Sequence, residues 1–358
     1  MLEKLWEPVA IGTMQLSNRL AMAAMTRDRA TREGVPTEMN AHYYAQRASL
    51  GLVITEGTQP SDDGQGYMLT PGIYTPEQIA GWKLVTDAVH AAGGKIYIQI
   101  MHVGRIAHPA NTLRGRQPLA PSAVKANGKM FTPQGLLELP EPRALSLDEI
   151  KSTIADFRHA AASAIAAGAD GVEIHGANGY LVHQFLSDNA NVRSDHYGGS
   201  IENRVRFAVE VAAAIAGEIG SDRTAIRISP ANPFNDIVEG DAPALYHALV
   251  SQLAGLKLAY LHLVHSGDDE LLRWIRTAWP SALMVNRGGR PREQIGVDVD
   301  AGLADLASVA QFALANPDLV ARLKSGAPLN APDRATFYGG DEHGYTDYPA
   351  LDTAPSVR

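Results

Sequence analysis

The feature that most constrains this chain is a regular alternation of short apolar runs with longer helical patterns. Eight such runs occur in order: RLAMAAM (19–25), GLVITEG (51–57), KIYIQIM (95–101), GVEIHG (171–176), TAIRISP (224–230), AYLHLVH (259–265), ALMVNRG (282–288) and DLASVAQ (305–311). Apolar strands that alternate with helices indicate a parallel sheet covered by helices. Eight such units without a break in composition favour a closed (β/α)8 TIM barrel, an α/β fold, as a single domain over residues 1–358.

Two segments fall outside this repeat. Before the first strand, VAIG and MQLS flank Thr13, and we expect an N-terminal hairpin that caps the floor of the barrel. After the third strand, residues 106–144 form a long excursion rich in Pro, Gly and Asn. A connection of that length in a compact domain is usually functional, so we expect a lid or a substrate loop there.

Charge and cysteine content exclude several function classes. The net charge of -8 argues against nucleic acid or an anionic membrane surface as partner. The chain has no cysteine, which excludes disulfides, thiolate metal sites and cysteine nucleophiles and fits a reducing cytoplasm. No apolar run approaches the roughly 20 residues of a membrane span, and the first residues lack the apolar stretch of a secretory signal. We expect a cytoplasmic protein, either a monomer or a homodimer.

In barrels of this class the active site lies at the carboxyl ends of the strands. The polar residues expected at that rim are Thr26, Gln99, His102, His175, Asn178, Tyr180, Arg227, His262, His265 and Arg287, with Gly288 and Gly289 beside it. A barrel that only held its shape would not need so many polar groups at one rim, although each alone could be a buried residue with satisfied partners.

Three of these residues suggest a reaction. His175 and Asn178 lie three positions apart just past a strand, so both could hydrogen-bond a carbonyl or nitro oxygen and polarise it. Tyr180 offers a phenol that could protonate a carbon acquiring negative charge. Spacing alone equally allows the trio to satisfy loop backbone groups. A metal site built on His175 and His183 is a weaker interpretation, because the spacing is poor and no carboxylates accompany it, and we expect no metal.

Other rim residues suit a flavin. The amide of Gln99 beside the fixed charge of Arg227 matches the N3, O2 and N1 edge of an isoalloxazine ring, where negative charge appears on reduction. A salt bridge inside the barrel is the alternative for Arg227. Gly288 and Gly289 would let the backbone approach a phosphate, since phosphate sites after the last two strands recur in such barrels.

At this point the residues match a known family. HGANGYLVHQFLSDNANVRSDHYGGSIENRVRF (175–207) closely resembles the Old Yellow Enzyme family of flavin-dependent ene-reductases. The resemblance extends along nearly the whole chain, through NRLAMAAMTR (18–27), YYAQRASLGLVITEGT (43–58), QIMHVGR (99–105), RISP (227–230), ANPDLVARL (315–323) and FYGGDEHGYTDYP (337–349). Such a set in this order is far more specific than a short motif.

The resemblance implies an NAD(P)H-dependent ene-reductase with FMN, working by a ping-pong sequence. Hydride would pass from flavin N5 to the β carbon of an α,β-unsaturated carbonyl or nitro compound, a small electron-poor alkene, and Tyr180 would protonate the α carbon. His175 and Asn178 would bind the substrate oxygen. The residues implied to hold the flavin ring are Ala24, Met25, Thr26 (at O4), Gly57, Gln99 and Arg227. Those implied to line the substrate pocket are Tyr67 and Tyr338.

Two departures from the family pattern matter. Met101 stands where the family usually has tryptophan, which could widen the pocket. Ala310 and Gln311 stand where a Gly-Arg pair normally grips the FMN phosphate. Losing that contact should weaken binding unless Arg287 or Arg290 supplies the charge.

The second departure keeps other interpretations open. One is a reductase of an imine or a conjugated C=C that uses a 5-deazaflavin coenzyme whose phosphate carries a long tail. Another is a catalytically silent barrel that serves as a binding protein. The retained residues argue against the silent barrel: Thr26, Gln99, His175, Asn178, Tyr180 and Arg227.

Overall fold

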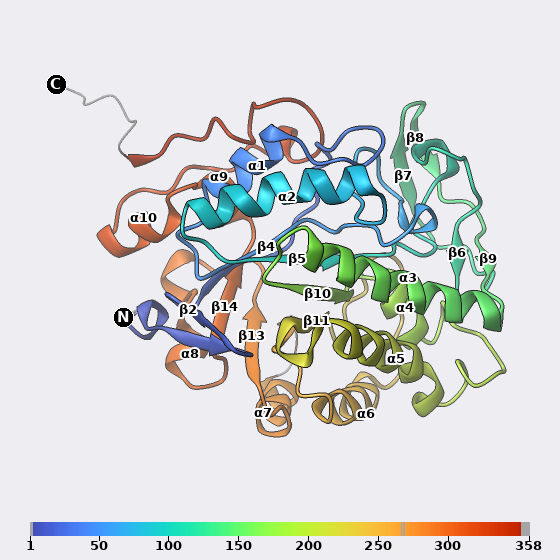
Figure 1. Cartoon of the computed structure of the whole chain (residues 1–358). Coiled ribbons are helices and arrows are strands. Elements are labelled where there is room, and N and C mark those ends of the chain that lie inside the picture. The colour runs from blue at the N-terminus through green and yellow to red at the C-terminus, as the bar shows by residue number, and fades with distance from the viewer. Residues whose placement is uncertain (1–2, 266, 268, 352–358) are drawn as a thin grey trace.

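A closed parallel barrel forms the centre of the molecule (Figure 1). The computed structural model describes residues 3–265, 267 and 269–351. Within these, strands hydrogen-bond in the closed order β10-β11-β12-β13-β14-β3-β4-β5. The barrel strands are β3 (Leu20–Met22), β4 (Leu52–Ile54), β5 (Ile96–Ile100), β10 (Gly171–Gly176), β11 (Thr224–Ile228), β12 (Tyr260–Val264), β13 (Ala282–Asn286) and β14 (Leu306–Val309). Each lies inside one of the eight apolar runs, so the predicted TIM barrel is confirmed.

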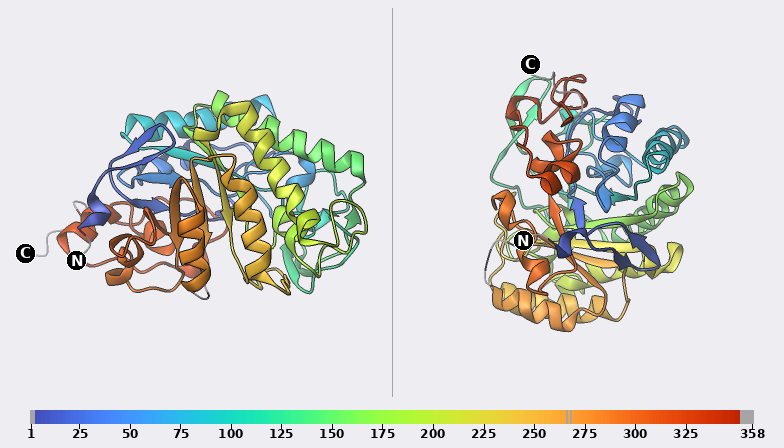
Figure 2. Two further views of the ribbon diagram at one scale, coloured as in Figure 1. Left: turned by 90° about the horizontal axis from the view of Figure 1, so that it is seen from below. Right: turned by 90° about the vertical axis from the view of Figure 1, so that its left-hand side faces the viewer.

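Helices surround this barrel in all views (Figures 1 and 2). They are α1 (Glu38–Ala45), α2 (Pro76–Ala91), α3 (Leu147–Ala166), α4 (Leu181–Leu186), α5 (Ile201–Ile219), α6 (Ala242–Ala254), α7 (Asp269–Ala278), α8 (Val297–Asp300), α9 (Gln311–Ala315) and α10 (Leu319–Ser325). Capping boxes fix the starts of the long helices α2 and α3, through Thr75 with Gln78 and Ser146 with Glu149. Among the described residues, no helix has the length and apolar character needed to cross a bilayer.

The predicted N-terminal hairpin is present and fills one end of the barrel. Its strands β1 (Val9–Ile11) and β2 (Met14–Leu16) pair antiparallel. Ile11 and Leu16 are almost fully buried in a cluster with side chains from the first half of the barrel strands, such as Leu52 and Tyr260. Figure 2 shows the hairpin, in dark blue, across that end of the barrel. The active site is therefore reached from the opposite end.

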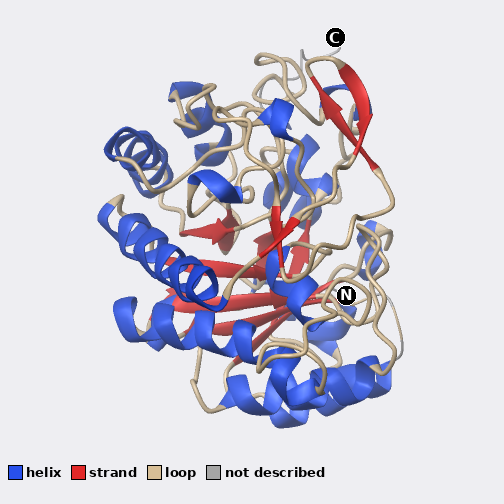
Figure 3. Ribbon diagram, turned by 90° about the vertical axis from the view of Figure 1, so that its right-hand side faces the viewer, coloured by secondary structure: helices blue, strands red, loops and turns tan. Residues whose placement is uncertain are grey.

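The excursion after β5 lies at that opposite end. It contains short strands β6 (Leu119–Ala120) and β9 (Arg143–Ala144), which pair parallel, and an antiparallel hairpin of β7 (Lys129–Thr132) and β8 (Gly135–Glu138). Figure 3 shows the β7–β8 hairpin projecting beyond the barrel strands. The hairpin lies at the barrel mouth, within the segment that the sequence predicted to be a lid or a substrate loop.

The hairpin plug leads to a stability prediction. Ile11→Ala removes buried methyl groups between the hairpin and the barrel, and should lower the free energy of unfolding by about 2 to 5 kcal/mol. Urea unfolding measures it, with Gln15→Ala on the exposed side of the same hairpin as the control. Equal stability of the two variants would mean that the hairpin does not brace the barrel.

Candidate active site

A cavity of about 780 Å³ lies at the carboxyl ends of the barrel strands. Most of the residues that the sequence singled out line it: Ala24, Met25, Thr26, Gly57, Tyr67, Gln99, Met101, His175, Asn178, Tyr180, Arg227, Gln311 and Tyr338. Strand register explains part of this convergence, because His175 of β10 pairs with Arg227 of β11. Met101 packs its thioether so closely over Gly57 that any Cβ there would collide with it. The barrel geometry thus brings distant segments to one mouth.

A buried carboxylate, Glu173, organises the floor of this cavity. It is fully buried, and its register partner Gln99 donates from Nε2 to Glu173 Oε1 at 2.7 Å. The Tyr260 hydroxyl and the His262 Nδ1–H donate to Oε2 at 3.0 and 2.8 Å. Burial alone would raise the pKa of Glu173, but His262, Arg227 and Gln99 outweigh it and the pKa is lowered. Glu173 is therefore ionised, and it fixes which end of the Gln99 amide is free for a ligand.

Two buried nitrogens at the cavity have no hydrogen-bond partner among the described residues. They are Nε of Arg227 and Nδ1 of His175. Such groups are rare in folded proteins unless a ligand or water completes them. Arg227 lines the cavity, and no salt bridge between it and a carboxylate is found in the described part of the chain. Its guanidinium fits the electron-rich edge of a flavin ring, whereas the free nitrogen of His175 is available to another ligand atom.

His175 is a neutral hydrogen-bonding group. Burial, followed by the charge of Arg227, lowers its pKa well below the ordinary histidine value. An uncharged imidazole can hydrogen-bond a carbonyl oxygen without carrying a competing charge.

Asn178 is held in one orientation by its neighbours. Its side-chain oxygen accepts from Asn232 Nδ2 at 2.9 Å, its backbone N–H donates to the Ser229 hydroxyl, and its carbonyl accepts from Asn235. The residue adopts a positive φ of 55°, which asparagine tolerates better than most residues. Because the side-chain oxygen of Asn178 is engaged, its side-chain nitrogen is the atom available to donate a hydrogen bond to a ligand.

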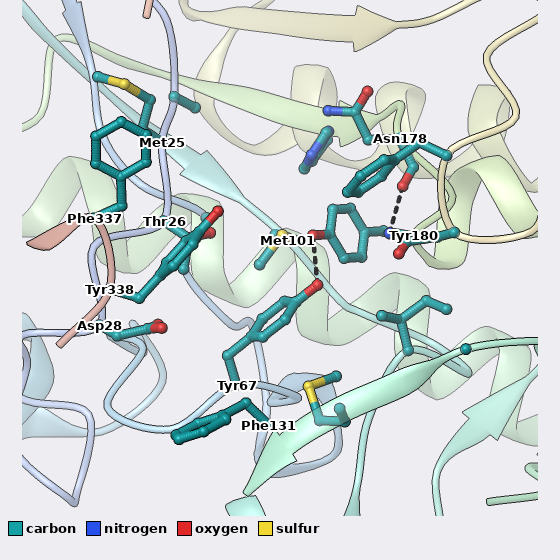
Figure 4. Close-up of a pocket in the computed structure, with 18 of the residues that line it drawn as sticks. Met25, Thr26, Asp28, Tyr67, Met101, Phe131, Asn178, Tyr180, Phe337 and Tyr338 are labelled. Atoms are coloured by element: carbon teal, nitrogen blue, oxygen red, sulfur yellow. Dashed lines mark hydrogen bonds between the residues drawn. The ribbon is translucent and has the colours of Figure 1, made fainter. Parts of the chain in front are cut away.

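Tyr180 and Tyr67 form a phenol pair inside the cavity. Their hydroxyl oxygens lie 2.9 Å apart. Figure 4 marks this contact with a dashed line. Burial raises the pKa of Tyr180 above its ordinary value, so the phenol keeps its proton at neutral pH. The ring of His175 lies 5.0 Å from that of Tyr180, centre to centre. Tyr67, which the sequence indicated only as a pocket wall, thus also contacts the candidate proton donor.

The C-terminal segment forms one wall and is tied to the first barrel loop. Arg27 donates to the carbonyl oxygens of Phe337 and Gly344 at 3.0 and 2.9 Å. Arg29 donates to the carbonyl of Asp341 at 2.9 Å. Because these carbonyls belong to the segment that carries Tyr338, the two arginines position that aromatic wall.

The predicted phosphate group is only partly brought to the cavity. Gln311 and Ala310 line it, but Arg287, Gly288 and Gly289 do not. The Arg287 guanidinium instead donates to Asp298 and Asp269 at 2.9 Å, and Arg290 also donates to Asp298. Asp269 begins α7, which precedes these arginines in the chain, and Asp298 lies in α8, which follows them. The sequence pattern did not connect either carboxylate with the arginines.

Both ring nitrogens of His183, which the metal interpretation would use as a ligand, have hydrogen-bond partners in the protein. Its ring accepts the Gly179 N–H at Nδ1 and bonds Glu239 at Nε2, so it braces a loop behind the site. No group of three or more metal-ligating side chains is found within the described residues.

Sequence reasoning missed several site residues. Glu173 was detectable as the polar position two before His175 on one strand, since alternate strand residues face the same side. Phe131 and Leu136 line the cavity from the β7–β8 hairpin; the sequence predicted a lid or substrate loop over residues 106–144 but singled out neither residue. The sequence did not mark Asp28 as a site residue, because a carboxylate between two arginines is typical of a solvent-exposed loop.

Comparisons with known proteins agree with this geometry. The family model for the NADH:flavin oxidoreductase / NADH oxidase family matches residues 4–330. The chain is 43% identical over 357 residues to a probable flavin mononucleotide-dependent alkene reductase of Leishmania infantum, covering 96% of this chain and 97% of that protein. Its structure is similar to morphinone reductase in complex with tetrahydroNAD, with 42% identity, TM-score 0.94 and 98% of both chains covered. An old yellow enzyme homologue from Zymomonas mobilis gives 39% identity and TM-score 0.94 over 97% and 99% of the two chains.

The burial of Asp28 leads to a prediction about pH. Burial, then the nearby Glu56, raises its pKa to about 8, against opposing effects of Arg29 and Arg27. A raised carboxyl pKa means that the folded state holds this proton more tightly, so its contribution to stability is lost as pH rises towards 8. Asp28→Asn should therefore gain stability relative to the parent between pH 5 and pH 9.

Urea unfolding of both proteins at saturating FMN, at each pH, measures this difference. A stability difference that is the same at both pH values would show that Asp28 titrates normally.

Proposed function

This chain belongs to the NADH:flavin oxidoreductase / NADH oxidase family, the family of the Old Yellow Enzymes, and we propose on that premise how its residues reduce an alkene. It is an NAD(P)H-dependent flavin oxidoreductase that uses FMN to reduce electron-poor C=C bonds. One observation carries the assignment of roles: the unpartnered nitrogens of Arg227 and His175 meet the buried phenol of Tyr180 in one cavity. Each of the three can serve a different part of the same reaction.

The ring of the cofactor is assigned to the side of the cavity with Thr26, Gln99 and Arg227. When bound, FMN supplies a hydride equivalent from its N5. Arg227 would hold the N1 and O2 edge of the ring, where its charge would favour the reduced form. Gln99, oriented by Glu173, offers its amide to the same edge, and Thr26 is assigned to O4.

The electron-withdrawing oxygen of the substrate is assigned to His175 and Asn178. The neutral imidazole and the free amide nitrogen converge on one oxygen and polarise the C=C bond. This makes the β carbon electrophilic, so that it accepts hydride.

Tyr180 protonates the α carbon. Its raised pKa keeps the phenol protonated until negative charge develops beside it, which suits a general acid. The Tyr67 hydroxyl, 2.9 Å away, is placed to stabilise the phenolate that results.

Both the nicotinamide and the alkene use this one mouth in turn. The N-terminal hairpin fills the other end of the barrel, and Met101 and the β7–β8 hairpin line the shared space. A ping-pong sequence follows, because the reductant must leave before the alkene enters.

The residues available to the FMN phosphate differ from those available to the flavin ring. Gln311 is the polar side chain that α9 presents to the cavity, and Arg287 and Arg290 are engaged by carboxylates. We assign the FMN phosphate to Gln311 at the edge of the cavity and to the backbone of Gly288 and Gly289, which lie outside the cavity lining and leave open space where added Cβ atoms would stand. Nothing supports the 5-deazaflavin alternative, since the similar alkene reductase is named for flavin mononucleotide.

The remaining parts of the proposal concern the setting of the enzyme. We assign residues 1–358 to one domain acting in the cytoplasm as a monomer or homodimer. The net charge of -8 supports a small-molecule enzyme that binds neither nucleic acid nor membrane. The lack of cysteine supports the cytoplasmic location.

Removing the Tyr180 hydroxyl tests the function. In the purified FMN-loaded enzyme, Tyr180→Phe should slow reoxidation of the reduced flavin by 2-cyclohexenone by about 100-fold or more, because the carbanion loses its proton donor. Flavin reduction by NADPH should keep its rate. Stopped-flow absorbance of the flavin band follows both half-reactions separately.

Tyr67→Phe is the matched control, because it removes the neighbouring hydroxyl and should slow reoxidation less. Full activity of Tyr180→Phe would contradict the proton-donor role, and an FMN-loaded parent that reduces no enone, nitro-olefin or maleimide would contradict the function itself.

Gln311 tests the phosphate assignment. Gln311→Arg adds a charge-assisted contact and should tighten FMN binding by about tenfold, whereas Gln311→Glu should weaken it by a similar factor. Fluorescence titration of apoprotein with FMN gives the dissociation constants. Equal affinities for all three proteins would place the phosphate elsewhere.

A further inference from the structure

Asp28 is a carboxyl group on the cavity wall that the reduction chemistry above does not use. Its Oδ1 is buried and has no hydrogen-bond partner within residues 3–265, 267 and 269–351. The adjacent arginines do not pair with it. Arg27 and Arg29 donate to backbone carbonyls of the C-terminal segment, and no salt bridge to Asp28 is found in the described structure. Asp28 as a whole is half-buried, but a carboxyl oxygen that is buried without a partner is costly and asks for a functional reason.

Backbone conformation does not supply that reason. Asp28 has a positive φ of 55°, a region in which asparagine and glycine are at least as well accommodated as aspartate. Its N–H donates to Glu56 Oε2 at 3.3 Å, a contact that any residue could make. Either asparagine or glycine would satisfy the turn without burying an ionisable group.

The surroundings of Asp28 favour a cation. The rings of Tyr67, Tyr338 and Phe131 line the same cavity, and Figure 4 shows Asp28 next to Tyr338 with Tyr67 on its other side toward the centre of the view. Aromatic faces attract cations, and a carboxylate supplies the opposite charge. Tyr338 is 67% exposed and Phe131 65%, so a ligand that covered these rings would also bury apolar surface.

We propose that Asp28 selects electron-poor alkenes that carry an ammonium group, which binds between its carboxylate and the rings of Tyr67 and Tyr338. The inference rests on the proposed function, because His175 and Asn178 hold the electron-withdrawing oxygen of the same molecule. In Figure 4 Asp28 and Asn178 lie on opposite sides of the view, with Tyr67 and Tyr180 between them. The substrate is therefore one whose amine and activated C=C bond lie at separate ends.

The other charged or ionisable groups described near Asp28 do not take its place as the anion that binds an ammonium group. Glu56 is buried behind the wall and accepts the backbone N–H groups of Arg27 and Asp28. Lys129, a cation of the cavity rim, lies 3.5 Å from Glu138. The phenols of Tyr67 and Tyr180 have raised pKa values through burial, so neither is an anion at neutral pH.

The pH dependence of selection follows from the raised pKa of Asp28. Without ligand the carboxyl loses its proton near pH 8, so it is largely neutral at pH 6 and largely ionised at pH 9. A bound cation stabilises the ionised form, and its binding releases a proton. Preference for a cationic substrate should therefore rise as pH increases from 6 to 9.

Two maleimides of the same shape test the proposal. N-(2-trimethylammonioethyl)maleimide carries a permanent charge, and N-(3,3-dimethylbutyl)maleimide is its neutral counterpart. With the FMN-loaded enzyme, the ratio of kcat/KM for the cationic over the neutral compound should rise about tenfold between pH 6 and pH 9. In Asp28→Asn the ratio should be about tenfold lower at pH 9 and independent of pH.

Glu342→Gln is the matched control, since it removes an exposed carboxylate from the C-terminal segment that packs against residues 27 and 29. It should keep the rise of the ratio with pH. Equal ratios for the parent and Asp28→Asn at pH 9 would overturn the proposal, as would loss of the rise in Glu342→Gln.

Equilibrium binding separates this inference from the function on which it rests. The corresponding succinimides cannot be reduced, and their dissociation constants at pH 9 are measured by calorimetry with the FMN-loaded protein. Tighter binding of the cationic succinimide that depends on Asp28 supports the ammonium site even if neither maleimide is turned over. Equal affinity of the parent for both succinimides overturns it, whatever the enzyme reduces.

Discussion

The carboxylate of Glu173 in the middle of the barrel is the constraint on which the site depends. It accepts hydrogen bonds from Gln99, Tyr260 and His262, which belong to strands β5 and β12, and it faces the charge of Arg227 on β11. An ionised group in this position is tolerated only because every neighbour is matched to it. Its negative charge balances that of the buried Arg227, whose Nε stays free for a ligand. Removal of the carboxylate would leave an uncompensated cation and an unoriented amide below the flavin site.

The barrel and much of its mouth could be predicted because their signals are local. Strand runs, helix caps and the N-terminal hairpin are each encoded by a few consecutive residues, and parallel strands end at the same rim. The positions of His175, Asn178, Tyr180 and Arg227 follow from that rule once the strands are known. What each side chain bonds does not follow from it.

The surprises arise from contacts between different elements of the fold. Arg287 looked available for a phosphate, but Asp269 of α7 and Asp298 of α8 bind it. Asp28 was not singled out from the sequence, yet it lies on a cavity wall completed by the C-terminal segment. Tyr67 was expected only to line the substrate pocket, and its hydroxyl also contacts that of Tyr180. Local patterns carry no information about such partners, whereas the resemblance to a family carries some of it.

The closure of the barrel also has a consequence for how the protein is made. Strand β14, the last of the barrel, pairs with β3, the first, and the segment that carries Tyr338 follows later still. A chain emerging from the ribosome therefore cannot close the ring of strands before β14 has been synthesised, and the segment that carries Tyr338 follows β14. Until then the polar groups of β10 and β11 lack the enclosure that makes burying a charge tolerable. We therefore expect the FMN site to form only after β14 has joined β3.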